Sequence, residues 1–176
     1  ANGWYSGERS PENFAEKAKF LSNKGYKALK FDPFGSEHLR LDKKSEIFIK
    51  QIIRSVREAV GPNVELMIEG HKRFNVFEAI KIAKWLNEFD VTWFEDPIDN
   101  NDIDSLIHVS KNSPVRIIAG EGFDKYKDFT RFVSSNATDI VNPEVIKIGG
   151  IGGAVKVANI CSSFDVDLAF HNAESP

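Results

Sequence analysis

The chain has few of the features that mark a secreted or membrane-bound protein. Its 176 residues include one cysteine, Cys161, so a disulfide within the chain is excluded and a reducing compartment is expected. No apolar run reaches the roughly 18 residues that a membrane span needs. The first residues, Ala-Asn-Gly-Trp-Tyr-Ser, have neither the charged nor the apolar region of a signal peptide. We therefore expect a soluble, cytoplasmic domain.

Several ligand-binding signals are also missing. The net charge is −3, with acidic and basic residues mixed along the chain, which gives no nucleic-acid surface and no basic patch for a membrane. No P-loop, HExxH or GxSxG occurs. The glycine-rich run at residues 149–153 does not complete a dinucleotide-binding motif, because residue 155 is valine. The hydrophobic content of 41% is nevertheless enough for a buried core.

Apolar strand-like runs alternate with helical patterns along the whole chain. Several of these runs are apolar throughout, as expected for strands that are covered on both faces. This βαβα order predicts a parallel sheet with right-handed crossovers. The predicted strands are residues 26–31, 64–68, 91–94, 115–119, 139–142 and 166–170, with a truncated strand at residues 3–5.

The predicted helices carry apolar residues at a spacing of three or four. Ser10-Pro11 marks the start of the first helix and Gly25 its end, and Gly61-Pro62 ends the second. The apolar positions are Phe14, Ala18 and Leu21; Ile49, Ile52, Ile53, Val56 and Val60; Phe77, Ile80, Ala83 and Leu86; Leu106 and Val109; and Phe129, Phe132 and Val133. Val155, Ala158 and Ile160 fall in the last predicted helix, after the glycine-rich turn.

Two architectures fit this alternation, a closed (β/α) barrel and an open doubly wound sheet. Polar residues able to do chemistry follow six or seven successive strands. That favours the barrel, which gathers such residues at its carboxyl-terminal face, whereas a doubly wound sheet concentrates them at one switch point. A barrel of this type typically needs about 250 residues. We therefore expect an α/β fold in which residues 1–176 form an incomplete barrel that lacks at least one strand.

Three glutamates recur at an equal interval, each at the end of a predicted strand. Glu69, Glu95 and Glu121 follow one another at 26 residues (95 − 69 and 121 − 95), which is room for a strand, a helix and two short loops. Neighbouring strands lie about 4.8 Å apart, so three such carboxylates can converge on one cation. Because oxygen ligands suit a hard divalent ion, the spacing predicts a metal site.

Two histidines and an acid lie at other strand ends. His171 closes the last predicted strand and is a candidate general base, with Glu144, after the preceding strand, fixing its tautomer. His71 follows Glu69 by two residues, so it points toward the same face and is a candidate general acid. An isolated histidine is more often structural, but these two accompany the three glutamates.

Lys30 and Asp32 lie at the end of the strand predicted at residues 26–31. The lysine is placed to pair with a substrate carboxylate or to hold the carboxylates of the site. The aspartate is placed to bind a hydroxyl group or the coordination sphere of the metal. Both residues also fit a simpler interpretation as solvated loop charges.

In their order along the chain, these motifs resemble those of the enolase superfamily, in its mandelate racemase-like branch. The matching segments are Lys30-Phe-Asp32, Glu69-Gly-His71, Phe94-Glu95-Asp96-Pro97, Gly120-Glu121, Asn142-Pro143-Glu144-Val-Ile-Lys-Ile-Gly-Gly150 and Phe170-His171-Asn172, which cover nearly the whole chain. The resemblance implies a modified (β/α)7β barrel with Glu69, Glu95 and Glu121 as magnesium ligands. Sites of this superfamily pair a lysine or histidine base with one or two Mg²⁺ ions.

Within that branch, the likeness is to acid-sugar dehydratases of the galactonate type. These enzymes carry an acidic ligand, one further residue and then a histidine, as Glu69-Gly-His71 does. Asp32 stands where the racemases have a second lysine. The acid that pairs with the base histidine is usually aspartate, and here it is Glu144.

The resemblance implies a Mg²⁺-dependent lyase acting on a small-molecule carboxylate. His171 removes the proton next to the carboxylate of a sugar acid, and His71 protonates the departing β-hydroxyl, which leaves a 2-keto-3-deoxy acid. A homo-oligomer is also implied, as is a separate capping domain that is absent from residues 1–176. A racemase, epimerase or cycloisomerase of the same superfamily is an open alternative, and so is a non-catalytic binding protein built on the barrel.

Overall fold

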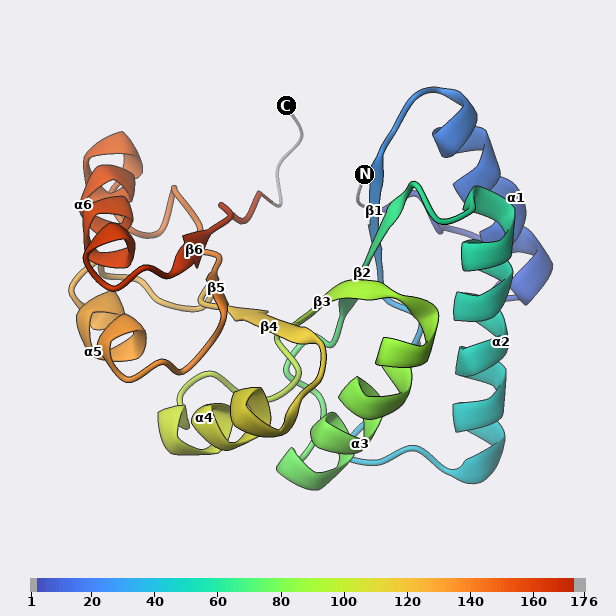
Figure 1. The fold of residues 1–176 in the computed structure, drawn as a ribbon, viewed down its shortest axis with the longest axis horizontal. Coiled ribbons are helices and arrows are strands. Elements are labelled where there is room, and N and C mark those ends of the chain that lie inside the picture. The colour runs from blue at the N-terminus through green and yellow to red at the C-terminus, as the bar shows by residue number, and fades with distance from the viewer. Residues whose placement is uncertain (1–2, 173–176) are drawn as a thin grey trace.

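Six parallel strands follow one another in chain order across a single sheet in a computed structural model, which describes residues 3–172 (Figure 1). The strands are β1 (Ala28–Phe31), β2 (Glu65–Glu69), β3 (Val91–Glu95), β4 (Arg116–Ala119), β5 (Ile140–Val141) and β6 (Asp167–Leu168). The α-helices are α1 (Pro11–Asn23), α2 (Lys43–Val60), α3 (Val76–Leu86), α4 (Ile103–Asn112), α5 (Asp128–Ser134) and α6 (Gly150–Ser163), and a 3-10 turn, η1 (Asn87–Phe89), follows α3.

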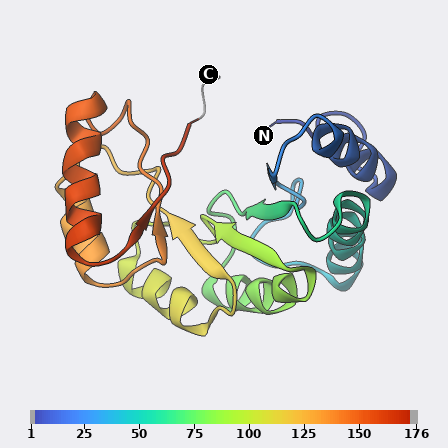
Figure 2. The ribbon, with the colours of Figure 1, turned by 45° about the horizontal axis from the view of Figure 1, so that its top comes forward.

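The strand order distinguishes the two predicted architectures. A doubly wound sheet reverses its order at a switch point, whereas here every strand pairs in parallel with the next one along the chain. The strands follow an arc, and the helices lie on its outer side (Figure 2). Within residues 3–172 the arc stays open, because β1 and β6 are the two edges of the sheet. The prediction of an incomplete (β/α) barrel is confirmed.

Four of the helices begin at a polar side chain that caps the first turn. The caps are Ser10 of α1, Asp42 of α2, Asn75 of α3 and Asp102 of α4, and each accepts a hydrogen bond from the backbone N–H three residues further on. Such a cap contributes about 1 kcal/mol, because it satisfies a donor that the helix leaves free. The predicted start of the first helix, at Ser10-Pro11, is confirmed.

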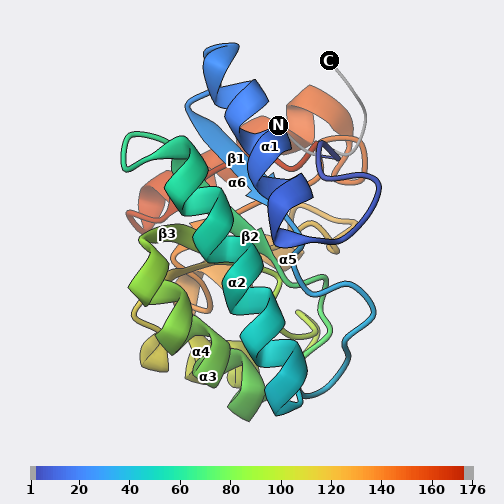
Figure 3. The ribbon, with the colours of Figure 1, turned by 90° about the vertical axis from the view of Figure 1, so that its right-hand side faces the viewer.

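The core lies between the sheet and the helices. α1 and α2 pack side by side (Figure 3), and the predicted apolar positions of both helices are largely buried. The largest fully buried side chains include Phe14, Phe31, Phe94, Phe129 and Phe132. Within the described part of the chain, no helix is long and apolar enough to cross a membrane.

Two local predictions are wrong. Residues 3–5 form a turn instead of a strand, because Trp4 and Tyr5 pack their rings against Phe14 of α1. In α3, the apolar spacing predicts that Phe77 is buried, but this side chain is 75% exposed. The buried face of this helix is formed by Ala79, Ile82, Ala83 and Leu86, together with Glu78 and Trp85. Phe77 precedes Ala79 by two residues, so it points to the opposite side of the helix.

Arg57, in the last turn of α2, joins the amino ends of two strands. Its guanidinium donates hydrogen bonds to the carbonyl oxygens of Gly61 (2.8 Å) and Val64 (2.7 Å), which precede β2. It also donates to those of Phe89 (3.1 Å) and Asp90 (2.8 Å), which precede β3.

We expect Arg57→Met to lower the free energy of unfolding by about 2–3 kcal/mol, because it keeps most of the aliphatic stem but leaves four carbonyl groups without their donor. Urea denaturation measures the loss. Arg54→Met is the matched control, since Arg54 only stacks over the Phe89 ring at 5.8 Å. That change is expected to cost less than about 1 kcal/mol. Equal losses in the two variants would contradict the role given to Arg57.

Candidate functional site

All the predicted site residues lie at or just after the carboxyl ends of strands, at one rim of the sheet. Glu69 and Glu95 are direct register partners at the ends of β2 and β3. Lys30 of β1 is in register with Met67, two residues before Glu69, so it projects from the same face. A cavity of about 260 Å³ on this face is lined by residues of β1, β2, β3 and β4 and by the segments after β5 and β6.

Lys30 lies between the carboxylates of Glu69 and Glu95. Its Nζ is 3.2 Å from Glu69 Oε2 and 2.6 Å from Glu95 Oε1. Burial opposes the charge on Lys30, but the two carboxylates outweigh it and raise its pKa. Burial, with the nearby charge of Glu95, raises the pKa of Glu69 to about 8. Lys30 is therefore shared between two carboxylates, and its charge does not offset the effect of burial on Glu69.

His171 connects Glu121 to Glu144. Its Nε2 lies 2.8 Å from Glu121 Oε2, and its Nδ1 lies 2.8 Å from Glu144 Oε2, which is the contact that the predicted base pair needs. The hydrogen bond to Glu121 raises the pKa of His171, and the hydrogen bond to Glu144 adds to this effect. Together they outweigh burial and bring the pKa to about 9. The segments that carry His171 and Glu144 are also joined by a backbone hydrogen bond, which the N–H of His171 donates to the carbonyl oxygen of Pro143 at 3.1 Å.

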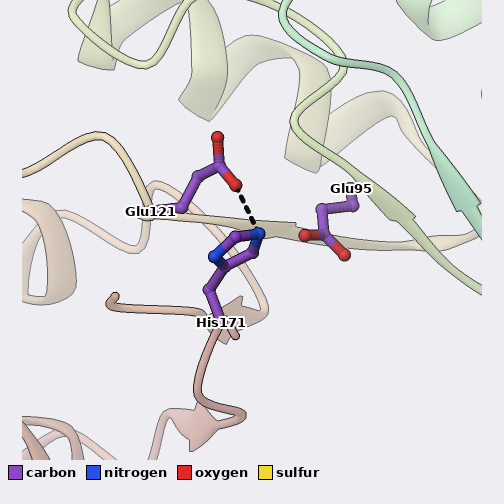
Figure 4. A group of neighbouring side chains, drawn as sticks. All are labelled: Glu95, Glu121 and His171. Carbon is purple, nitrogen blue, oxygen red and sulfur yellow. Dashed lines mark ion pairs between the residues drawn. The ribbon is translucent and has the colours of Figure 1, made fainter. Parts of the chain in front are cut away.

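A group of three side chains in the described residues is able to hold a metal ion. Glu95, Glu121 and His171 each offer a ligand atom, and these atoms lie within 4.8 Å of one another. In Figure 4 the imidazole ring lies between the two carboxylates, joined to Glu121 by its ion pair. Glu69 was predicted as the third ligand and is not in this group. Its two oxygens instead accept from Lys30 and from the backbone N–H of His71.

His71 pairs with Asp32 instead of with the glutamates. Nδ1 of His71 lies 2.9 Å from Asp32 Oδ2, and this hydrogen bond raises the pKa of the histidine. Burial opposes ionisation of Asp32, but the hydrogen bond from His71 and the charge of Arg73 outweigh it and lower the pKa of this carboxyl. Asp32 is also held by the backbone N–H of Phe34 at 2.8 Å and by an ion pair with Arg73.

The backbone between Glu69 and His71 requires a glycine. A Cβ atom at Gly70 would lie 2.8 Å from the carbonyl oxygen of Asp96 and 3.0 Å from that of Glu95. The following residues, His71 (φ 50°) and Lys72 (φ 60°), are both in the left-handed region, which is uncommon for residues with side chains. Two backbone hydrogen bonds stabilise this strained conformation. The N–H of Gly70 donates to the carbonyl oxygen of Glu95 and the N–H of Lys72 to that of Asp96, each at 2.7 Å.

Three residues of the site were given no role from the sequence. Lys72 pairs with Glu121 at 3.1 Å and with Asp96 at 3.3 Å. Arg73 pairs with Asp32, and Asn142 donates from Nδ2 to Glu95 Oε1 at 3.0 Å. For Lys72 and Arg73, the sequence feature that could have indicated a role is the basic run His71-Lys72-Arg73 shortly after Glu69. For Asn142, the corresponding feature is only a polar residue at the end of a predicted strand.

Parallel βα units with acidic and basic side chains gathered at the carboxyl ends of the strands define a (β/α)-barrel protein with a candidate metal site. Residues 13–176 match the sequence model of the family described as "Enolase C-terminal domain-like". The chain belongs to this family.

Two relatives are similar over the whole chain. A D-gluconate dehydratase of Thermoproteus tenax is 36% identical over 176 residues, and a D-gluconate/D-galactonate dehydratase of Picrophilus torridus is 36% identical over 178. The chain spans only 35% and 45% of their lengths. A solved mandelate racemase/muconate lactonizing enzyme from Jannaschia sp. CCS1 matches with a TM-score of 0.87 and 28% identity, covering 98% of this chain and 45% of that one.

We expect His171 to be protonated at neutral pH in protein treated with a chelator. Its NMR titration should have a midpoint near 9 instead of the ordinary 6.5. Because the pKa in the folded state is raised, the stability that the charged ring contributes is complete below pH 6.5 and is lost as the pH rises through 9. Glu121→Gln should lower the midpoint more than Glu144→Gln. A midpoint near 6.5 in the unsubstituted protein would contradict the geometry of this group.

Proposed function

We propose that these residues are the barrel part of a Mg²⁺-dependent acid-sugar dehydratase. The observation that carries the proposal is the cluster of Glu95, Glu121 and His171, in which His171 also contacts Glu144 and Glu69 is the register partner of Glu95. Membership of the family and the printed activities of the two dehydratase relatives support it. In this proposal residues 1–176 belong to a (β/α)7β catalytic domain, and a capping domain lies outside them.

The donor set fits a hard divalent cation. Glu69, Glu95 and Glu121 offer carboxylate oxygens, the ligands that Mg²⁺ takes from proteins. Burial, followed by the charge of Glu95, raises the pKa of Glu69, so a cation placed beside these carboxylates would favour their ionised forms. These three glutamates would hold the ion, and the ion would stabilise the charge that develops on the substrate carboxylate when the neighbouring proton is removed.

His171 is assigned as the general base. Its Nδ1 is held by Glu144, so Nε2 is the nitrogen available to accept the proton on the carbon next to the substrate carboxylate. In the structure Nε2 is engaged by Glu121, which keeps the ring charged. As a base, His171 must be neutral, so this contact has to be released first. Glu144 then remains to stabilise the imidazolium that forms when the proton is taken.

His71 is assigned as the general acid. Asp32 holds Nδ1 of its ring and favours the protonated form, so Nε2 is left to deliver a proton to the β-hydroxyl. The bond between carbon 3 and this oxygen breaks while a double bond forms between carbons 2 and 3, and water leaves. The resulting enol tautomerises to a 2-keto-3-deoxy acid. Each proton transfer contributes typically about 10²–10⁴-fold to the rate.

Lys30 had two predicted roles, binding the substrate carboxylate or holding the carboxylates of the site. Its contacts with Glu69 and Glu95 support the second role. It also lines the cavity next to Glu95 and His171, where the negative end of a sugar acid would lie. A lysine there lowers the cost of bringing an anion to a rim that is already acidic.

The metal site is tested by Glu95→Gln, which keeps the shape of the side chain and removes its charge. We expect Mg²⁺ affinity, measured by isothermal titration calorimetry, to fall by more than the roughly 10- to 100-fold that outer contacts of a metal site cost. Glu65→Gln is the matched control, because Glu65 lies exposed at the amino end of β2, away from the rim. Unchanged Mg²⁺ binding in Glu95→Gln would remove the proposed site.

The reaction is tested with D-gluconate and D-galactonate in deuterated water with Mg²⁺. Keto-acid formation is followed together with deuterium entry at carbon 2 of the remaining sugar acid. Both acids are named in the activities of the two relatives. We expect His171→Ala to reduce both signals by about 10²–10⁴-fold. His71→Ala should reduce keto-acid formation by a similar factor and leave deuterium entry largely intact.

The remaining outcomes separate the alternatives. Equal loss of both signals in His71→Ala would remove its role as the acid. Deuterium entry without any keto acid in the unsubstituted protein would indicate an epimerase. Neither signal, with Mg²⁺ and sugar-acid binding retained, would indicate a binding protein.

A further inference from the structure

Asn142 is a buried polar residue of the cavity that the assigned chemistry does not use. It follows β5, is 2% exposed, and lines the cavity together with Lys30, Glu95 and His171. Its Nδ2 donates a hydrogen bond of 3.0 Å to Oε1 of Glu95. Glu95 belongs to β3, so the asparagine reaches past β4 to make this contact.

Gly120, directly after β4, is the residue beside which this amide passes. A Cβ atom there would lie 3.5 Å from both Oδ1 and the backbone N of Asn142, an ordinary contact distance, but only 3.1 Å from Cε1 of Phe129. Its φ of +133° is a conformation that residues with side chains rarely adopt. Glycine at this position is therefore required by the backbone and by Phe129, and it leaves the contact between Asn142 and Glu95 unobstructed.

The hydrogen bond makes the two oxygens of Glu95 unequal. Oε1 receives both Nζ of Lys30, at 2.6 Å, and Nδ2 of Asn142, at 3.0 Å. A carboxylate held by two donors on one oxygen cannot rotate without breaking both contacts. The other oxygen, Oε2, is then presented in a fixed direction.

The other end of the Asn142 amide argues against a purely stabilising role. In the described structure its Oδ1 is buried and has no hydrogen-bond partner. A buried acceptor without a donor destabilises a fold, and an apolar side chain of similar size would avoid that cost. The donor that Asn142 supplies to Glu95 is therefore what the position gains from an amide.

We propose that Asn142 is a positioning residue, which holds Glu95 so that Oε1 is committed to donors of the protein and Oε2 is left for the cation. This inference rests on the proposed metal site. Fixing the orientation of a ligand in this way is a general property of side chains that surround metal sites, and losing one such contact typically lowers metal affinity by about 10- to 100-fold.

Asn100 provides a matched control. It is also buried, its Nδ2 donates to Oδ1 of Asp96 at 2.8 Å, and its Oδ1 is likewise without a partner in the described structure. Asn142→Ala and Asn100→Ala therefore remove the same groups, but only the first removes a contact with a proposed ligand.

The experiment measures Mg²⁺ affinity by calorimetry and thermal unfolding in the presence of a chelator. We expect Asn142→Ala to weaken Mg²⁺ binding by about 10- to 100-fold, with a shift of the metal-free unfolding midpoint no larger than that of Asn100→Ala. Mg²⁺ binding by Asn100→Ala should be nearly unchanged. Asn142→Leu, which fills the volume without a donor, should lose affinity as Asn142→Ala does and guards against a collapse of the alanine variant.

Unchanged Mg²⁺ affinity in Asn142→Leu would overturn the inference, and so would an equal loss in Asn100→Ala. An unsubstituted protein that binds no Mg²⁺ would instead overturn the proposed function itself. The two failures are therefore distinguishable.

Discussion

The repulsion between Glu69 and Glu95 is the interaction on which the rim is built. The two residues are paired across adjacent strands, so the sheet itself prevents them from moving apart. Buried like charges interact much more strongly than charges in water, and a counter-charge must lie close by. Lys30 supplies one between them, while Lys72 and His171 do the same for Glu121. The three glutamates are thus joined to Lys30, Lys72 and His171 by ion pairs, and the last two bases are shared further with Asp96 and Glu144.

These shared contacts make the groups of the site interdependent. His171 is charged because Glu121 accepts from it, and Glu121 is in turn shared with Lys72. Any change in the engagement of Glu121 changes the charge state of the histidine that faces the cavity. The protonation of His171 is therefore linked to the other contacts of Glu121.

The sequence was sufficient for the fold because apolar runs and helix caps are local signals. All six strands of the sheet and the start of α1 follow from them. It was less informative where tertiary contacts decide. The rings of Trp4 and Tyr5 pack on α1 instead of extending a strand. Phe77 lies outside the buried face of α3, which includes Ala79, Ile82, Ala83 and Leu86.

The same distinction holds at the site. The equal spacing of Glu69, Glu95 and Glu121 predicted that they share one rim, because strand ends in a parallel sheet coincide. The pairing of His71 with Asp32 was not predicted, since it depends on a loop in a left-handed conformation. Contacts that pass over a neighbouring strand, such as that of Asn142 with Glu95, have no signature in the order of residues.

Arg57 lies at the opposite end of the sheet from all of this chemistry. It hydrogen-bonds to the residues before the amino ends of β2 and β3 and so joins them to α2. The carboxylates of Glu69 and Glu95 lie at the carboxyl ends of the same two strands. The contacts that stabilise the fold and the side chains of the candidate site consequently lie at opposite ends of the same strands, several residues apart in the sequence. Loops at one end are free to diversify toward new ligands, because the scaffold that tolerates those changes is secured at the other.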